Sequence, residues 1–208
     1  MALKNRQVQR YARQILLQEV GGAGQEALLA AGAVALTGGG GADSVGLAYL
    51  AAGGSPVRVP ASRIVSADEV GFLFDAEDVG KFAGPRLKSA LKDFNPDAAR
   101  DPQSMGLLAE LPAQVATPAP WVVIGWGEGG RGGLVYRTAS GCALCMLETL
   151  RALAPKGPSA ASVALGALAA LAYQRCVLRL SEPVGGLWLE ESGAISPLAV
   201  TRCQEHSP

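Results

Sequence analysis

Three of the four cysteines and the single histidine of this 208-residue chain fall into two short pairs that could share one metal ion. Cys142 and Cys145 form a C-x-x-C pair, and Cys203 and His206 form a second pair near the end of the sequence. Three thiolates and one imidazole are a tetrahedral set that Zn²⁺ prefers, and four protein ligands leave no position for water or substrate. The spacing therefore predicts a structural zinc site that ties residue 203 to the middle of the chain.

Other interpretations of these residues stay open at this stage. Cys142 and Cys145 could be a redox-active pair or plain buried thiols, and the second pair could be a chance feature of a loose tail. The fourth cysteine, Cys176, lies in a separate apolar stretch and is expected in the core.

The composition is that of a globular protein with a sizeable core. Hydrophobic residues make up 49% of the chain, and 18 acidic residues balance 18 basic ones. This balance and the scarcity of aromatic residues favour neither a nucleic acid nor an anionic membrane as partner. The polar N-terminal stretch lacks the apolar core of a secretory signal, and the apolar stretch 160–173 is too short to span a bilayer. We expect a cytoplasmic protein, where a C-x-x-C pair holds metal more often than it forms a disulfide.

The elements that must position these residues indicate an α/β protein. A short apolar strand at 33–36, the glycines at 38–41 and a helix at 42–52 form the opening of a doubly wound, Rossmann-like unit with a mainly parallel sheet. Further strands are expected at 57–59, 121–124, 134–137, 187–190 and 198–202. Further helices are expected at 5–18, 25–31, 68–74, 85–94, 145–153 and 159–180, with a short one considered at 105–111.

The length suits a single domain over residues 1–208. We expect N-terminal helices in residues 1–32, a Rossmann-like core in residues 33–137 and a zinc-bearing C-terminal part in residues 138–208.

Several stretches follow the pattern of one known family. They are Arg10-Tyr11-Ala12-Arg13-Gln14-Ile15, Gly24-Gln25-Glu26, the glycine loop, Tyr49-Leu50-Ala51-Ala52-Gly53-Gly54, Asn95-Pro96 and the Cys142/Cys145 pair. By these motifs nearly the whole chain resembles the ThiF/MoeB/HesA family, the bacterial relatives of ubiquitin-activating enzymes. The resemblance implies a dimer whose subunits use ATP and Mg²⁺ to adenylate the C-terminal glycine of a small ubiquitin-like or sulfur-carrier protein.

The resemblance also assigns roles to particular residues. Gly38, Gly40 and Gly41 correspond to the phosphate-binding glycines, and Arg13 to an arginine that reaches the ATP site of the partner subunit. Arg13 could equally well pair with a carboxylate on the surface.

The chain departs from the family pattern at several positions that bind the nucleotide and magnesium in the family. Asp43 replaces the last glycine of the loop, the stretch 57–62 has no acid for the ribose, and the stretch 67–72 has no arginine. The family's next lysine could survive as Lys81 or Arg86. The strand that carries the magnesium aspartate is expected to be deleted between Pro96 and Pro120, and 155–163 holds no cysteine.

We therefore expect a shortened, non-catalytic homologue that does not use ATP and Mg²⁺. It would act as a dimer subunit or scaffold, in a homodimer or with an active homologue, and hold a small carrier protein or a peptide. One alternative is an active adenylyltransferase in which Asp78, Glu77 or Glu128 binds magnesium. Another is a module in which the glycine loop binds a nucleotide or small anion.

Overall fold

The computed structural model describes residues 2–31, 34–35, 41–71, 73–100, 106–110, 120–128, 131–154 and 161–206. At residues 34, 35, 43, 106–110 and 206 it describes the backbone alone. Among the described helices, none has both the length and the apolar character that crossing a lipid bilayer requires.

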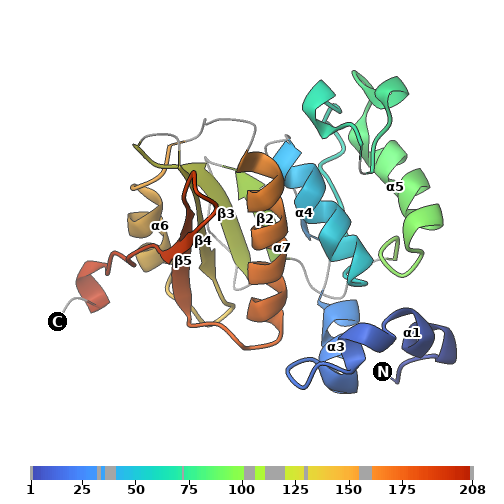
Figure 1. The fold of residues 1–208 in the computed structure, drawn as a ribbon, viewed down its shortest axis with the longest axis horizontal. Helices are drawn as coiled ribbons and strands as arrows, with labels where there is room; N and C mark the ends of the chain where they lie inside the picture. Colours follow the sequence, from blue (N-terminus) through green and yellow to red (C-terminus); the bar gives the residue numbers. More distant parts are fainter. Residues whose placement is uncertain are drawn as a thin grey trace.

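A single mixed sheet forms the centre of the fold (Figure 1). Its described strands lie side by side in chain order: β1 (Val34–Ala35), β2 (Gly106–Glu110), β3 (Trp121–Trp126), β4 (Gly132–Arg137), β5 (Val184–Leu189) and β6 (Ile195–Pro197). The first three are parallel, and each later strand is antiparallel to the one before it.

The expected α/β class is confirmed, but the expected mainly parallel, doubly wound sheet is not what the described strands form. Residues 127–131 alone join β3 to β4. A parallel connection needs a crossover of a dozen or more residues, so two strands joined this closely must be antiparallel. The short connections 127–131 and 190–194 thus account for the antiparallel pairs β3–β4 and β5–β6, whereas β4 and β5 pair antiparallel across a long connection that contains α6 and α7.

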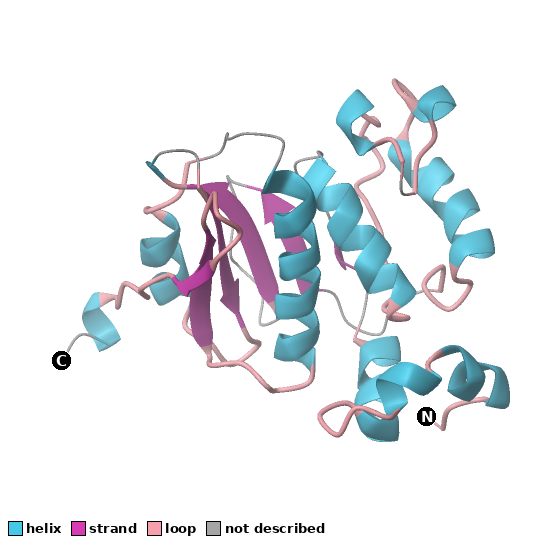
Figure 2. Cartoon of the chain, viewed as in Figure 1, coloured by secondary structure: helices cyan, strands magenta, loops and turns pink. Residues whose placement is uncertain are grey.

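Helices cover both faces of the sheet (Figure 2). They are α1 (Asn5–Arg10), α2 (Ala12–Ile15), α3 (Gly21–Ala30), α4 (Gly41–Ala52), α5 (Ala83–Phe94), α6 (Ala143–Leu150) and α7 (Ser162–Val177). Side chains alternate along β3: Val122 and Ile124 join a core formed with α4, α5 and α7, whereas Val123 packs against α6 with Met146 and Leu150. This period of two is that of a strand buried on both faces.

Two expected helices are wrong. Residues 105–111 contain β2 instead, because a short apolar run is compatible with either a helix or a buried strand. Of residues 68–74, the described ones (68–71 and 73–74) form no α-helix, and the short 3-10 turn η1 (Ala67–Glu69) is the helical element found there.

Two expected strands also differ. The segment 57–59 is not a strand of the described sheet, although the Val57 N–H donates to the Ala98 carbonyl at 3.1 Å. The last hairpin closes with β6 rather than at 198–202, and the chain then runs to a 3-10 turn, η5 (Gln204–His206).

Candidate functional site

The three cysteines of the predicted metal site come together in the structure. Cys142 caps the start of α6, Cys145 lies in its first turn, and Cys203 lies in the segment after β6. The Cys203 Sγ atom is 3.8 Å from that of Cys142 and 3.5 Å from that of Cys145. Zn–S bonds of about 2.3 Å in a tetrahedron place two sulfur atoms about 3.8 Å apart. The spacing of the three sulfur atoms therefore fits one zinc ion.

The electrostatics of the cluster also favour a bound cation. The Cys145 backbone N–H bonded to the Cys142 sulfur is the main reason that the pKa of Cys142 lies below its usual value. Burial is the main reason that the pKa of Cys203 is raised. Three thiolates this close repel one another, so their full ionisation requires a positive charge among them.

Hydrogen bonds hold the segment around Cys203 against α6 without any metal. The Thr149 hydroxyl donates to the Cys145 carbonyl at 2.7 Å and accepts the Thr201 N–H at 3.0 Å. The Cys203 N–H points at the Cys145 sulfur, 3.4 Å away. Partners of this kind orient metal ligands before the metal binds.

The fourth predicted ligand, His206, lies in η5, shortly after Cys203. Its side chain is outside the described part of the structure, so its role as a ligand stays a prediction. Cys176 is buried in α7, as expected of a core residue, and is not part of the cluster of described cysteines.

The second predicted site lies at the start of α4. Gly38 and Gly40 lie outside the described residues, but Gly41 is the first residue of the helix. Its N–H donates to the Asp68 Oδ2 atom at 3.0 Å. The sequence predicts an acid at this helix end in Asp43, but the side chain of Asp43 lies outside the described part of the structure. The acid that the structure shows there is Asp68, a residue of η1.

Asp68 is held there as a carboxylate. A hydrogen bond from the Ser66 hydroxyl, the bond from the Gly41 N–H and the positive charge of Arg63 all lower the pKa of Asp68. The start of a helix also favours negative charge. A phosphate group at this helix end would have to displace the carboxylate or lie beside it, where the two anions repel each other.

Glu69, the neighbour of Asp68, fastens this turn to the body of the protein. Glu69 is fully buried, forms an ion pair with Arg63 and accepts the Ser44 hydroxyl of α4 at 3.0 Å. Its carboxylate also accepts the Ser66 N–H at 2.9 Å. We missed this network in the sequence, although the Ser66-x-x-Glu69 spacing is that of a capping box.

The expected deletion before Pro120 is wrong in one respect. A strand, β2, is present between the Asn95-Pro96 turn and β3, and its last residue is Glu110. The carboxyl ends of β1, β2 and β3 lie at one edge of the sheet, where α/β proteins bind ligands. An acidic residue thus ends the strand that we expected to be missing.

Two of the other predicted charged residues are already paired. The Arg86 Nε atom lies 3.3 Å from Asp78 Oδ1, and Asp78 also accepts the Asp75 N–H at 3.2 Å. This pairing favours neither Arg86 as a phosphate ligand nor Asp78 as a magnesium ligand.

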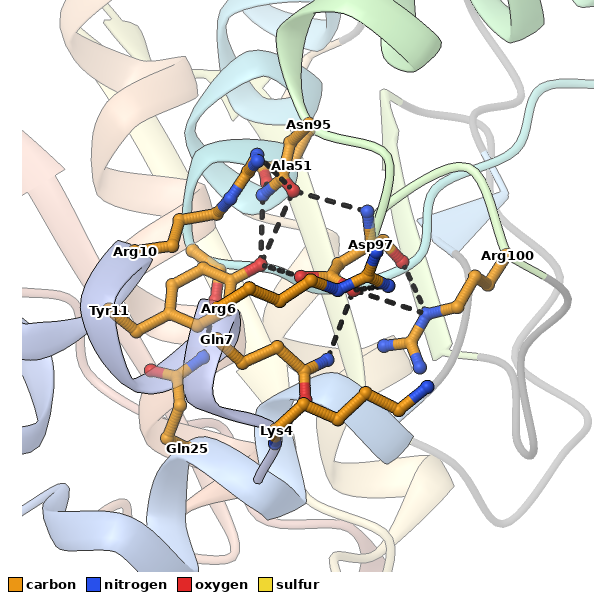
Figure 3. Close-up of polar contacts among 11 residues, drawn as sticks. Lys4, Arg6, Gln7, Arg10, Tyr11, Gln25, Ala51, Asn95, Asp97 and Arg100 are labelled. Carbon is orange, nitrogen blue, oxygen red and sulfur yellow. Dashed lines mark hydrogen bonds and ion pairs between the residues drawn. The ribbon is translucent and has the colours of Figure 1, made fainter. Parts of the chain in front are cut away.

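The N-terminal helices dock on the Asn95–Asp97 turn through a buried polar network (Figure 3). The Tyr11 hydroxyl donates to Asp97 Oδ2 at 3.1 Å and accepts the Asn95 side-chain amide at 3.0 Å. Gln7 donates to Asp97 Oδ1 at 3.0 Å. Tyr11, Asn95 and Asp97 are each 2% exposed, so this network fixes the position of α1.

Arg13 of α2 is not part of that network. Its side chain is exposed and forms no ion pair with any residue that the structure describes. We had two interpretations of Arg13. The one in which Arg13 pairs with a surface carboxylate has no support among the described residues of this chain, because none of their carboxylates pairs with it.

Comparison with solved structures gives the fold a context. The chain is similar to PaaA over 97% of its own length and 76% of PaaA, with a TM-score of 0.70 and 15% identity. It is similar to Escherichia coli MccB, crystallised with succinimide, over 94% of its length and 72% of MccB, with a TM-score of 0.65 and 17% identity. The structure of MccB with AMPCPP and MccA gives a TM-score of 0.62 at 18% identity.

Both neighbours are ThiF-family proteins. The motifs and the three-dimensional likeness therefore agree on the fold, and at such low identity the likeness carries the fold alone. No known family model and no curated protein matches the sequence.

Proposed function

We propose that this chain is a non-catalytic homologue of the enzymes that activate ubiquitin-like and sulfur-carrier proteins, acting as a dimer subunit or scaffold. The observation that carries the proposal is the hydrogen bond from the Gly41 N–H to the Asp68 carboxylate. An acid of the chain itself takes up a helix N-terminus at which a nucleotide phosphate would be bound. Glu69, paired with Arg63, accepts the Ser66 N–H and so fixes the turn that carries that acid.

The neighbours suggest what such a scaffold holds. MccB has been crystallised with ATP and, separately, with MccA. A homologue that has lost the nucleotide function can keep the surface that holds the second partner. We therefore propose that this chain binds a small carrier protein or a peptide, in a homodimer or beside an active homologue to which it lends the exposed Arg13.

The cysteine cluster supports this structural role. Cys142, Cys145 and Cys203, with His206 as the fourth ligand, would hold a zinc ion that supplies no chemistry beyond joining the segment after β6 to α6.

Glu110 favours one alternative, an active adenylyltransferase. It is the last residue of β2, at the sheet edge where the parallel strands terminate and where α/β proteins bind ligands, and Glu is a residue type that can bind the magnesium of a nucleotide. This alternative requires a triphosphate to displace Asp68 from Gly41.

An ATP–pyrophosphate exchange assay distinguishes the non-catalytic homologue from the active adenylyltransferase. Non-catalytic function predicts no exchange above background, with or without carrier proteins and peptides that end in glycine. Exchange that disappears in a Glu110→Gln variant would establish the active alternative instead.

The partner role has its own test. Added to an active homologue, this chain should raise the homologue's exchange rate, and Arg13→Ala should remove the increase while the exposed neighbour variant Gln18→Ala keeps it. An unchanged rate with the wild-type chain would contradict the loan of Arg13.

A further inference from the structure

Arg137, the last residue of β4, is a buried cation on the side of the sheet that carries the cysteine cluster. Its backbone lies opposite Trp121 of β3 and Val184 of β5, and the residue is 4% exposed. Side chains two positions apart on a strand lie on the same face. Val135 packs with Met146 of α6, so Arg137 also lies on the face that α6 covers.

A hydrogen bond joins Arg137 to the turn that leads into α6. The Arg137 Nη1 atom donates to the Gly141 carbonyl at 3.1 Å, and Gly141 directly precedes Cys142. The Gly141 N–H donates to the Thr138 carbonyl at 3.0 Å, and the Thr138 N–H donates to the Pro183 carbonyl at 2.9 Å. Arg137 and the residue before β5 together fix the place at which Cys142 joins the cluster.

Gly141 packs directly against Arg137 and Pro183. A Cβ atom added at Gly141 would overlap the Pro183 carbonyl oxygen and would lie 2.7 Å from the Arg137 Cγ atom. No side chain fits at this position, so the turn and the stem of Arg137 are in close contact. A change at Arg137 is therefore felt at the backbone of the residue before Cys142.

The charge of Arg137 is also coupled to the cluster. Burial is the main reason that the pKa of Arg137 lies below its usual value, and the negative charge of the Cys142 thiolate acts in the opposite direction. Zn²⁺ bound by three thiolates carries one net negative charge, and a neutral imidazole as fourth ligand leaves this unchanged. A buried charge is unfavourable unless an opposite charge lies near it. The guanidinium and the zinc-loaded cluster meet this need for each other.

We propose that Arg137 is a positioning residue of the cysteine cluster, which holds the turn before Cys142 and balances the negative charge that three thiolates leave on a bound zinc ion. The inference rests on the metal site of the proposed function and deepens it. A cation beside the cluster favours a set of three thiolates over a set of two, because zinc with two thiolates and neutral partners carries no net charge.

Zinc affinity of the whole chain, measured by competition with a chelator, tests the role of Arg137. Arg137→Met keeps an apolar stem but removes the charge and the hydrogen bond. It should weaken zinc binding about tenfold to a hundredfold, as the loss of a group that orients a metal ligand does. Arg137→Lys keeps the charge and should recover part of that loss.

Arg202→Met is the matched control. Arg202 directly precedes Cys203, is exposed, and lines a cavity of about 760 Å³ together with Cys142 and Cys145. Water and salt screen an exposed charge far more than a buried one. Arg202→Met should therefore change the zinc affinity much less than Arg137→Met does.

A change in the number of thiolates separates charge from packing. With Cys203→His the zinc-bound set has two thiolates and is neutral, so Arg137→Met should weaken zinc binding less in this background than in the wild type. A residue that only packed against the turn would have the same effect in both backgrounds.

Failure of the metal site and failure of this inference give different results. A wild-type chain that binds no zinc would overturn both. A wild-type chain that binds zinc, with equal affinity in Arg137→Met, no recovery in Arg137→Lys or equal effects in the two backgrounds, would overturn the role of Arg137 alone. Should Arg137→Met fail to fold, the wild-type chain decides: zinc should shift the Nε–H resonance of Arg137 more than that of Arg202, and equal shifts would contradict the proposal.

Discussion

Gly166 of α7 lies so close to Ala42 of α4 that a Cβ atom added at position 166 would be 2.3 Å from the Ala42 carbonyl oxygen. It would also be 2.8 Å from the Val45 Cβ atom. The two helices meet at backbone distance here, which only a residue without a side chain allows. This contact fixes the position of α4, and with it that of Gly41, relative to the sheet.

Replacing this glycine should separate the two helices. We expect Gly166→Ala to lower the free energy of unfolding by roughly 1–3 kcal/mol, the usual cost of overpacking, measured by urea denaturation. Gly84→Ala is the matched control, because an added Cβ atom there meets nothing within 4 Å. It should stabilise the protein by up to about 1 kcal/mol through helix propensity. Equal effects of the two variants would argue against close packing at Gly166.

The metal site makes a prediction about composition as well as stability. The purified protein should carry one zinc ion per chain, and Cys145→Ala should release it and lower the unfolding temperature, because metal binding contributes to folding. Cys176→Ala, which removes a buried thiol outside the cluster, should retain the zinc. Metal analysis of both variants checks this, and zinc retained by Cys145→Ala would exclude the cluster as its site.

The fourth ligand can be identified in the same way. Cobalt(II) bound to the wild-type chain should give the absorption of a tetrahedral site with three thiolates and one nitrogen. His206→Ala should change that spectrum and weaken zinc binding, whereas Glu205→Ala should do neither. An unchanged spectrum in His206→Ala would assign the fourth position to another group.

Tyr11 should make the protein sensitive to alkali. Burial is the main factor that raises the pKa of Tyr11 from 10.0 to about 12. The folded state thus holds this proton more tightly than the unfolded state does, so the contribution is complete below pH 10 and is lost as the pH rises toward 12. Tyr11→Phe should lower stability by roughly 1–3 kcal/mol at neutral pH, because Asp97 loses a buried donor.

Unfolding measured between pH 9 and pH 12 gives the comparison for Tyr11. Stability of the wild type should fall more steeply over this range than that of Tyr11→Phe, whereas Tyr49→Phe, at a residue that is 54% exposed, should follow the wild type. Parallel curves for wild type and Tyr11→Phe would show that the hydroxyl is not buried in its network.

Asp68 should act at the opposite end of the pH scale. Its pKa is lowered from the ordinary 3.8, chiefly by the Ser66 hydroxyl, so its contribution is present above that value and is lost as the pH falls through the folded-state pKa. We expect Asp68→Ala to lower the free energy of unfolding by about 1 kcal/mol, as the loss of a side chain that caps a helix does. Urea unfolding at pH 7 and pH 3 should show a smaller cost in acid, because Asp68 begins to be protonated as the pH falls below 3.8. Asp93→Ala, at an exposed residue, is the control and should cost little at either pH.

The sequence was sufficient where the signal is local. The apolar spacing of Leu87 and Leu91 predicted α5, and the uninterrupted apolar run at 121–124 predicted β3. The cysteine cluster was also predictable, because ligand type and short spacing identify such sites even when the pairs lie 58 residues apart. These features depend on neighbouring residues or on the chemistry of a few side chains.

Other features depend on contacts that no local pattern encodes. The five-residue run of β2 does not alternate, so its pairing with β1 and β3 decided between helix and strand. The bond between Asp68 and Gly41 joins residues 27 positions apart, and only the folded chain brings η1 to the start of α4. The sequence therefore contains Asp68, on which the proposed function rests, but gives no sign that its carboxylate accepts the Gly41 N–H.

The consecutive order of the strands has a consequence for how the chain is made. Each described strand pairs with the one synthesised before it, so the sheet can grow by one strand at a time as the polypeptide leaves the ribosome. Cys203 follows all six described strands in the sequence, so a metal ion bound at the cysteine cluster would join a segment that is synthesised after the sheet to a helix, α6, that is synthesised before β5.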